Sequence, residues 1–312
     1  NYSQSFGQST IASGSSSHAE GTTSIAGGNS SHAEGDTTTA SGNASHAEGG
    51  ITIASGLASH AEGTYTTASG DRSHAEGDET IASGEGSHAE GYQTSATTQY
   101  SHAQNYITQA NGNYSHSQGN QTIADGESSH AEGAYTTAQG TGSHAEGFQS
   151  IAQAQYSHAE GYQTLTSGSN SHAEGSGTIS SGGNSHAEGT NTIAAGTSSH
   201  AQNNTTQANG SDSHAGGEDT YAEGQTSFIH SKSSVVIGDR SVVLGGQNIT
   251  GTTNDTVYVP YLNIRDIASG TSIGNLGFDI DGNVVTGTTG GNQGLASVLT
   301  YGNATSGTSI TI

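Results

Sequence analysis

The stretch Ser17-His18-Ala19-Glu20-Gly21 is the unit from which most of this chain is built. The motif returns every 14 residues, and its second position takes 15 of the 16 histidines of the chain. These are His18, His32, His46, His60, His74, His88, His102, His116, His130, His144, His158, His172, His186, His200 and His214. A fixed short period is typical of solenoids, in which each repeat packs only against its neighbours. The spacing therefore predicts a stack of similar coils.

The composition limits how such a stack can be stabilised. The 312 residues include 49 glycines and one proline, and only 28% are hydrophobic. This composition is typical of low-complexity or disordered chains, but disorder does not require a strict period. A 14-residue coil cannot bury a large apolar face of its own. We therefore expect stacking within the chain and association between chains to supply the missing burial.

Charge excludes several functions. The net charge is −23, and the four basic residues are Arg72, Lys232, Arg240 and Arg265. Nucleic-acid binding and a polybasic membrane anchor both need a basic surface, so we expect neither. Without cysteine, disulfides and thiolate metal sites are excluded. No apolar run is long enough to insert into a membrane, and no signal peptide is recognisable. The lack of methionine leads us to expect a fragment or a processed chain.

Small residues recur at fixed places in each coil, counted from the histidine as position zero. Serine precedes the histidine, alanine follows it, serine or threonine lies at position six, and glycine favours positions three and ten. Alternation of small and larger residues is the pattern of a strand with one face toward a narrow interior. Each coil is thus predicted to hold two short strands and two tight turns. Asn105 and Asn203 replace the glycine of position three, which indicates a left-handed backbone conformation there.

The outward residues of the two predicted strands differ. Positions seven and nine of the second strand vary, as at Ile25 and Thr39, whereas histidine and glutamate of the first strand barely change. We therefore expect the first strand to contact another subunit. The glutamates of this predicted interface are Glu20, Glu34, Glu48, Glu62, Glu76, Glu90, Glu132, Glu146, Glu160, Glu174 and Glu188. Gln104, Gln118 and Gln202 replace them in three coils, and Gly216 does so in the last. Val242 and Leu244 occupy the same two positions in a later coil and extend the predicted interface.

This pattern resembles the head repeats of YadA-like trimeric autotransporter adhesins. The family phrase Asn-Ser-Val-Ala-Ile-Gly also lies on a 14-residue coil, and Ser241-Val242-Val243-Leu244-Gly245 is close to it. The SHAEG motif keeps the serine, alanine and glycine but has His and Glu where the family has Val and Ile. The resemblance covers about residues 1–246 and implies an all-β fold: a homotrimeric, left-handed parallel β-roll, or β-solenoid.

The C-terminal part has a different character. Residues 247–289 are predicted to form a β connector, with Asp281-Gly282 as a hairpin turn, and residues 290–312 begin a further Gly/Thr/Ser-rich β module. The segments Gly245–Gly251, Asp255–Ile264 and Leu295–Asn303 resemble junctions in phage tail-fibre and virion appendage proteins. Asp279 begins a stretch similar to a Ca²⁺ loop, but Gly290 stands where that loop needs a glutamate.

The repeated His and Glu allow three interpretations. The first is a hydrogen-bonded polar seam between chains, because buried polar groups must be paired. The second is a structural scaffold that binds metal through the histidines. The third is a pH-dependent assembly that histidine protonation weakens. A hydrolase is excluded, because adjacent Ser and His on a strand point to opposite faces. No cofactor motif is present.

Aromatic residues concentrate in the predicted turns of the middle coils. They are Tyr92, Tyr100, Tyr106, Tyr114, Tyr135, Phe148, Tyr156 and Tyr162. Exposed tyrosine makes adaptable contacts with sugars and proteins, so this set is a candidate receptor contact, although packing between adjacent turns would also explain it.

Together these features predict a non-enzymatic, extracellular surface fibre that forms a homotrimer. The C-terminal resemblance favours a phage or virus tail or capsid fibre that attaches to a host-cell receptor or glycan and joins other virion proteins. The head of a bacterial trimeric autotransporter adhesin is the alternative, and a metal-binding scaffold is a third hypothesis.

Overall fold

The computed structural model describes residues 2–260, 276–278 and 284–286 of the chain. It divides into two compact units, Asn1–Pro260 and Tyr261–Ile312. The described residues form strands and turns, which confirms the predicted all-β class. Among them, no helix has the length and apolar character needed to cross a membrane.

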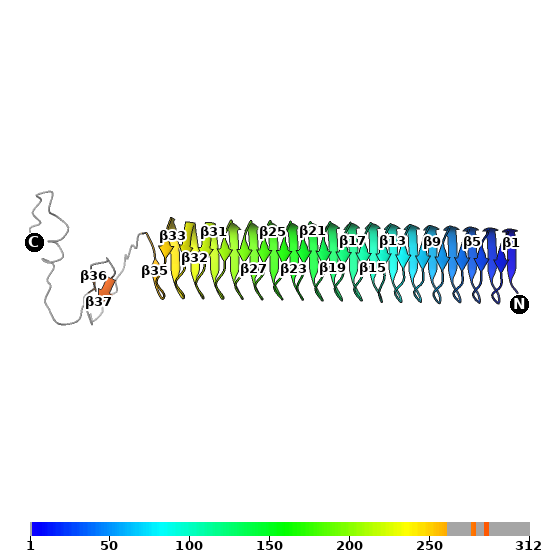
Figure 1. Ribbon diagram of the computed structural model, residues 1–312, viewed down its shortest axis with the longest axis horizontal. Helices are drawn as coiled ribbons and strands as arrows, with labels where there is room; N and C mark the ends of the chain where they lie inside the picture. Colours follow the sequence, from blue (N-terminus) through cyan, green and yellow to red (C-terminus); the bar gives the residue numbers. More distant parts are fainter. Residues whose placement is uncertain (1, 261–275, 279–283, 287–312) are drawn as a thin grey trace, which may run out of the picture. The chain divides into compact units, whose positions relative to one another are not determined.

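The first unit is a parallel β-solenoid in which each coil has one long and one short strand (Figure 1). The long strands are β1 (Gln4–Gln8), β3 (His18–Thr22), β5 (His32–Asp36), β7 (His46–Gly50), β9 (His60–Thr64), β11 (His74–Asp78), β13 (His88–Tyr92), β15 (His102–Tyr106), β17 (His116–Asn120), β19 (His130–Ala134), β21 (His144–Phe148), β23 (His158–Tyr162), β25 (His172–Ser176), β27 (His186–Thr190) and β29 (His200–Asn204).

The short strands complete these coils. They are β2 (Ile11–Ala12), β4 (Ile25–Ala26), β6 (Thr39–Ala40), β8 (Ile53–Ala54), β10 (Thr67–Ala68), β12 (Ile81–Ala82), β14 (Ser95–Ala96), β16 (Gln109–Ala110), β18 (Ile123–Ala124), β20 (Thr137–Ala138), β22 (Ile151–Ala152), β24 (Leu165–Thr166), β26 (Ile179–Ser180), β28 (Ile193–Ala194) and β30 (Gln207–Ala208). The predicted two-strand coil is therefore confirmed. The handedness of the roll and its association into trimers stay predictions.

Paired residues of neighbouring coils are offset by one 14-residue repeat. β7 pairs in parallel with β9 so that His46 lies beside His60 and Glu48 beside Glu62. The His46 amide donates to the Ser59 carbonyl at 2.9 Å, and the same bond recurs in coil after coil. Because the pairing offset equals the sequence period, every position of the repeat forms a column along the roll.

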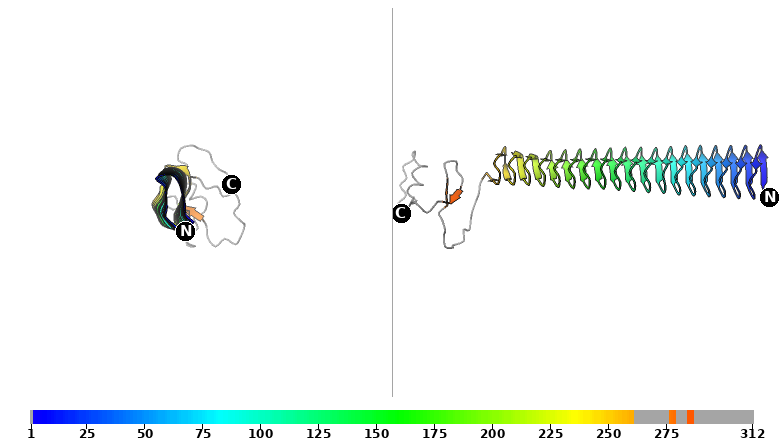
Figure 2. Two further views of the ribbon diagram at one scale, coloured as in Figure 1. Left: turned by 90° about the vertical axis from the view of Figure 1, so that its right-hand side faces the viewer. Right: turned by 60° about the horizontal axis from the view of Figure 1, so that its bottom comes forward.

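The interior is lined by small side chains. Ala131 and Ala138, at positions one and eight, are 0% exposed, and so is Thr136 at position six. Among the described residues, the side chains larger than threonine that are fully buried are Ile229, Val236 and Val243, near the C-terminal end of the roll. Seen end-on, the coil is correspondingly flat (Figure 2, left). The small-residue pattern thus sets the thickness of the roll.

The turns use left-handed backbone at three places in each coil. In one coil these are Gly63 with φ 108°, Tyr65 with φ 56° and Arg72 with φ 58°. The predicted left-handed conformation of Asn105 and Asn203 is confirmed, with φ of 88° and 82°. The expectation that the position-three glycine fills the interior is wrong, because this residue lies in the partly exposed outer layer. Its positive φ, rather than lack of space inside, selects glycine.

The period changes near the predicted boundary at Gly246, but the roll continues past it. Its last strands are β31 (His214–Ala222), β32 (Phe228–Val236), β33 (Val242–Gln247), β34 (Thr250–Gly251) and β35 (Val257–Tyr258). A register irregularity between His230 and Lys232 inserts one residue, after which Val242 pairs with Val257, 15 positions on. The first compact unit accordingly ends at Pro260.

The second unit contains a two-stranded antiparallel sheet of β36 (Leu276–Phe278) and β37 (Val284–Thr286). Phe278 pairs with Val284, as strands flanking a hairpin do. Asp281-Gly282, the Asp279 loop and residues 290–312 lie outside the described residues.

Candidate functional site: the histidine and glutamate columns

One outer face of the roll is built from the first strand of each coil. Its histidine and its position-two residue project outward, while the alanine between them points inward and is fully buried. Alternation along a strand dictates this arrangement. We call the stacked histidines from His18 to His214 the histidine column. The glutamate column is the adjacent row of position-two residues, the eleven glutamates together with Gln104, Gln118 and Gln202.

The imidazole rings of the histidine column stack on one another. From His32 to His200 the centroids of neighbouring rings are 4.7–4.9 Å apart and the rings are within 9° of parallel. At the two ends the geometry changes, because His18 is turned 82° from His32 and His214 is turned 84° from His200. The side chains remain about one-third exposed, for example 36% at His46. The column is therefore reachable by a ligand or a second chain.

Two phenylalanines close the histidine column. Phe228 stacks on His214 with centroids 4.7 Å apart, and Phe6 lies 5.7 Å from His18 at the other end. The sequence analysis missed both residues as parts of the site. The spacing could have revealed Phe228, which follows His214 by 14 residues. Phe6 sits in the glutamate register, opposite Glu20.

The glutamate column lies within reach of the imidazoles. Within one coil the Nε2 atom of the histidine is 3.3 Å from the carboxylate oxygen at His18–Glu20, 3.6 Å at His46–Glu48 and 4.0 Å at His88–Glu90. Nearer the C-terminal end the contact moves to the preceding coil, as at His200 and Glu188, where it is 3.4 Å. His and Glu of one chain are thus already neighbours, which the sequence analysis expected mainly between chains.

The glutamine coils interrupt the row of carboxylates. The Gln104 amide donates to the side-chain oxygen of Gln118 at 2.6 Å, and Gln118 donates to Glu132 at 3.2 Å. A neutral amide can donate to the next carboxylate along the column, whereas another carboxylate would repel it. The glutamines therefore relieve repulsion inside the column.

Electrostatics favours neutral imidazoles. Burial first, then the neighbours His102 and His130, lowers the pKa of His116 from 6.5 to about 4. Burial and the neighbours His200 and His230 likewise lower the pKa of His214 to about 4. The same direction of pKa shift, with burial as its largest cause, holds for His32, His102, His130, His158, His172 and His200.

The pKa values of two neighbouring carboxyl groups in the glutamate column shift in opposite directions. Burial and hydrogen bonds with Glu174 and Glu146 raise the pKa of Glu160 to about 7. The pKa of Glu174 is lowered despite burial, because hydrogen bonds from Glu160 and Glu188 favour its charged form. Glu160 and Glu174 thus titrate as a coupled pair.

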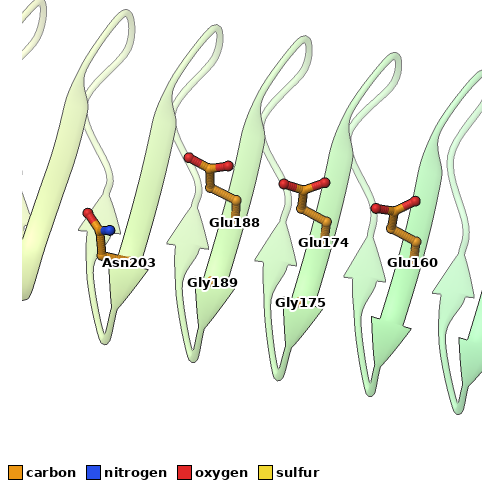
Figure 3. A pocket seen from close by; sticks show the side chains of 6 residues that line it. All are labelled: Glu160, Glu174, Gly175, Glu188, Gly189 and Asn203. Atoms are coloured by element: carbon orange, nitrogen blue, oxygen red, sulfur yellow. The ribbon is translucent and has the colours of Figure 1, made fainter.

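A shallow surface groove runs along the C-terminal half of this face. It is lined by Glu160, Glu174, Gly175, Glu188, Gly189 and Asn203. Figure 3 shows the side chains of Glu160, Glu174 and Glu188 in one row on successive coils, with Asn203 following. The groove offers a line of oxygen ligands or hydrogen-bond acceptors.

Apolar side chains continue both columns toward the C-terminal end. Val242 pairs with Phe228 in the histidine register and Leu244 pairs with His230 in the glutamate register. Leu244 is 43% exposed and Val242 is partly buried. The columns therefore end in the apolar pair Val242 and Leu244. Contact of this pair with another subunit stays a prediction.

The candidate aromatic contacts separate into two rows on different turns. Tyr92, Tyr106, Phe148 and Tyr162 are the last residues of first strands, Tyr135 directly follows one, and Tyr100, Tyr114 and Tyr156 lie in the turn before the next first strand. All eight are 36–59% exposed. Tyr92 stacks on Tyr106 with centroids 5.3 Å apart, and Tyr100 on Tyr114 at 5.5 Å. Stacking covers ring faces, so these pairs present mainly ring edges and hydroxyl groups to a partner.

The adjacent Ser and His are separated as expected. Ser73 is buried at 1% exposure and its hydroxyl donates to the Gly70 carbonyl at 2.7 Å, on the inner side of the strand. His74 lies on the outer face. This geometry provides no serine–histidine pair for nucleophilic chemistry.

The regular parallel solenoid and its repeated polar face place this chain in the class of structural repeat proteins. A family model described as "YadA head domain repeat (2 copies)" matches residues 7–31, 52–73, 75–97, 131–152 and 173–199. No curated protein matches the chain. These stretches are thus similar to YadA head repeats, and YadA head domains are parts of cell-surface adhesins.

Proposed function

We propose that this chain is the head region of a bacterial trimeric autotransporter adhesin, a non-enzymatic part of a surface appendage. The observation that carries the proposal is the match to YadA head repeats in five stretches of one uninterrupted solenoid. This reverses the preference for a phage or virus fibre. The fibre interpretation rests on segments between Gly245 and Asn303, most of which lie outside the described residues, and the family match gives it no support.

Assembly into a homotrimer through the histidine and glutamate columns is part of this proposal. The columns form the least variable outward face of the repeat, and their histidine and glutamate side chains are about one-third exposed in a single chain. Three such faces around a common axis would place donors and acceptors opposite one another. Interiors this thin bury little apolar surface, so association between chains would add the missing stability.

Light scattering on the purified protein tests the assembly and should give the mass of three chains. Because the chain has no cysteine, single cysteines report which face is inside. His130→Cys should form covalent dimers on oxidation, whereas Thr137→Cys, on the second strand of the same coil, should not. A monomeric mass, or cross-linking only through position 137, would reject this arrangement.

The exposed aromatic rows would make the contact with a host surface. Their exposed edges and hydroxyl groups suit polar contacts with a protein or glycan on the host cell. Replacing Tyr92, Tyr106 and Tyr162 together by alanine should reduce cell attachment severalfold. Tyr65→Ala, an equally exposed tyrosine outside the stacked rows, is the matched control. Unchanged attachment of the triple variant would remove the rows from the proposal.

A further inference from the structure

The columns place a nitrogen and an oxygen ligand side by side on each coil. The Nε2 atom of the histidine lies 3.4 Å from the glutamate oxygen at His32–Glu34, 3.6 Å at His130–Glu132 and 3.7 Å at His60–Glu62. Two bonds of about 2.1 Å that meet at a tetrahedral ion separate their ligand atoms by about 3.4 Å. The two side chains therefore already span one edge of a metal coordination shell.

Most Nε2 atoms of the histidine column have no hydrogen-bond partner among the described residues. The Nε2 atoms of the column are shielded from solvent and, within the part of the chain that the structure describes, accept or donate no hydrogen bond at His32, His46, His60, His74, His88, His102, His116, His130, His144, His158, His172, His186 and His200. Orphaned nitrogens beside carboxylates are a donor set that Zn²⁺ and Ni²⁺ prefer.

We propose that the histidine and glutamate columns bind Zn²⁺-like transition-metal dications, with one His–Glu pair of a single chain holding each ion. The ring centroids of two stacked histidines are 4.8 Å apart, beyond the span of about 4.2 Å that two Zn–N bonds allow, so a second histidine would have to tilt to share the ion. Water or a neighbouring chain completes the shell. Since both ligands come from one chain, the site does not depend on the trimer.

Occupancy is limited by repulsion between ions on adjacent coils. Two dications about 4.8 Å apart weaken each other's binding by roughly a hundredfold or more, even at the dielectric constant of water. Gln104 and Gln118 divide the glutamates into a run of six, Glu20 to Glu90, and a run of five, Glu132 to Glu188. Filling alternate coils of both runs gives about six ions per chain.

Equilibrium dialysis of the full chain against ZnCl₂ at neutral pH, followed by elemental analysis, tests the proposal. The triple variant Glu160→Gln, Glu174→Gln and Glu188→Gln leaves only two glutamates in the second run, so zinc uptake should fall by about one third. Glutamine is native at positions 104, 118 and 202, so the coils should accept it, and circular dichroism checks this.

The matched control is Glu79→Gln, Glu85→Gln and Glu218→Gln, which removes the same charge outside the columns and should leave uptake unchanged. In the opposite direction, Gln104→Glu with Gln118→Glu joins the two runs and should add about one ion. Uptake below one zinc per chain in the unaltered protein would overturn the proposal. Equal losses in the triple variant and the control would also overturn it, because they would show binding to net charge alone.

Discussion

Replacing His116 by glutamine tests the electrostatics of the histidine column where they are simplest. The coil of His116 has Gln118 in the glutamate column, and the preceding coil has Gln104, so this imidazole is not paired with a carboxylate in its own coil. Its pKa is lowered from 6.5 to about 4, mainly by burial. As the pH falls, His116 is therefore protonated in the unfolded chain before it is protonated in the folded chain. The stability that His116 contributes is full above pH 6.5 and is lost as the pH falls toward 4.

The size of this effect follows from the two pKa values. A difference between 6.5 and about 4 gives a ceiling of roughly 3.4 kcal/mol at about 1.4 kcal/mol per pH unit. The ring is partly exposed, and solvent screening reduces this figure. At pH 5, where only part of the titration is complete, we expect a loss of about 1 kcal/mol from His116.

Denaturant unfolding, followed by circular dichroism at pH 7.5 and pH 5, measures this loss of stability. Glutamine is a native occupant of the histidine position, since Gln4 pairs with His18 in the first coil. The free energy of unfolding should fall between the two pH values by about 1 kcal/mol less in His116→Gln than in the unaltered protein. An identical pH dependence of the two proteins would refute the assignment of a depressed pKa to this column.

Three further substitutions test other parts of the structure, each by the same unfolding measurement. Gly133→Ala places a Cβ 2.2 Å from the Gly147 carbonyl oxygen at a φ of 103°, so a loss of about 2 kcal/mol or more is expected, whereas Gly50→Ala, which meets nothing within 4 Å, should be nearly neutral. Ile107→Asn should stabilise by about 1 kcal/mol, because isoleucine is strained at φ 52° and asparagine tolerates that conformation; a destabilised variant would contradict the strain argument. Ile229→Ala should cost about 2–4 kcal/mol, since Ile229 is fully buried, and a cost below 1 kcal/mol would show that the wider end coils collapse around the gap.

Much of the fold could be predicted because the period and the small residues are local signals. The spacing of His46 and His60 equals the pairing offset, and alanines such as Ala131 occupy the interior that the alternation assigned to them. The extension of the roll to Tyr258 could not be predicted in this way. One extra residue between Leu244 and Gln247, opposite the step from His230 to Lys232, breaks the sequence period but leaves the strand pairing intact.

The candidate site was predictable in its residues and less so in its geometry. Strand alternation placed His and Glu on one face, but only coordinates give the ring stacking and the same-coil contact of His18 with Glu20 at 3.3 Å. Side-chain rotamers decide both, and sequence spacing does not fix them. The aromatic residues were interpreted as one group, whereas Tyr92 and Tyr100 lie at different edges of a coil because eight of its 14 positions separate them.

The central claim is that the histidine and glutamate columns face the axis of a three-chain assembly. An experimental structure of the assembled roll, at a resolution that shows side chains, tests it most directly. We expect three chains in register, with the rings from His32 to His200 directed toward a common threefold axis. A single-chain particle, or a trimer whose axis is lined by the second strands such as β8 and β10, would contradict it.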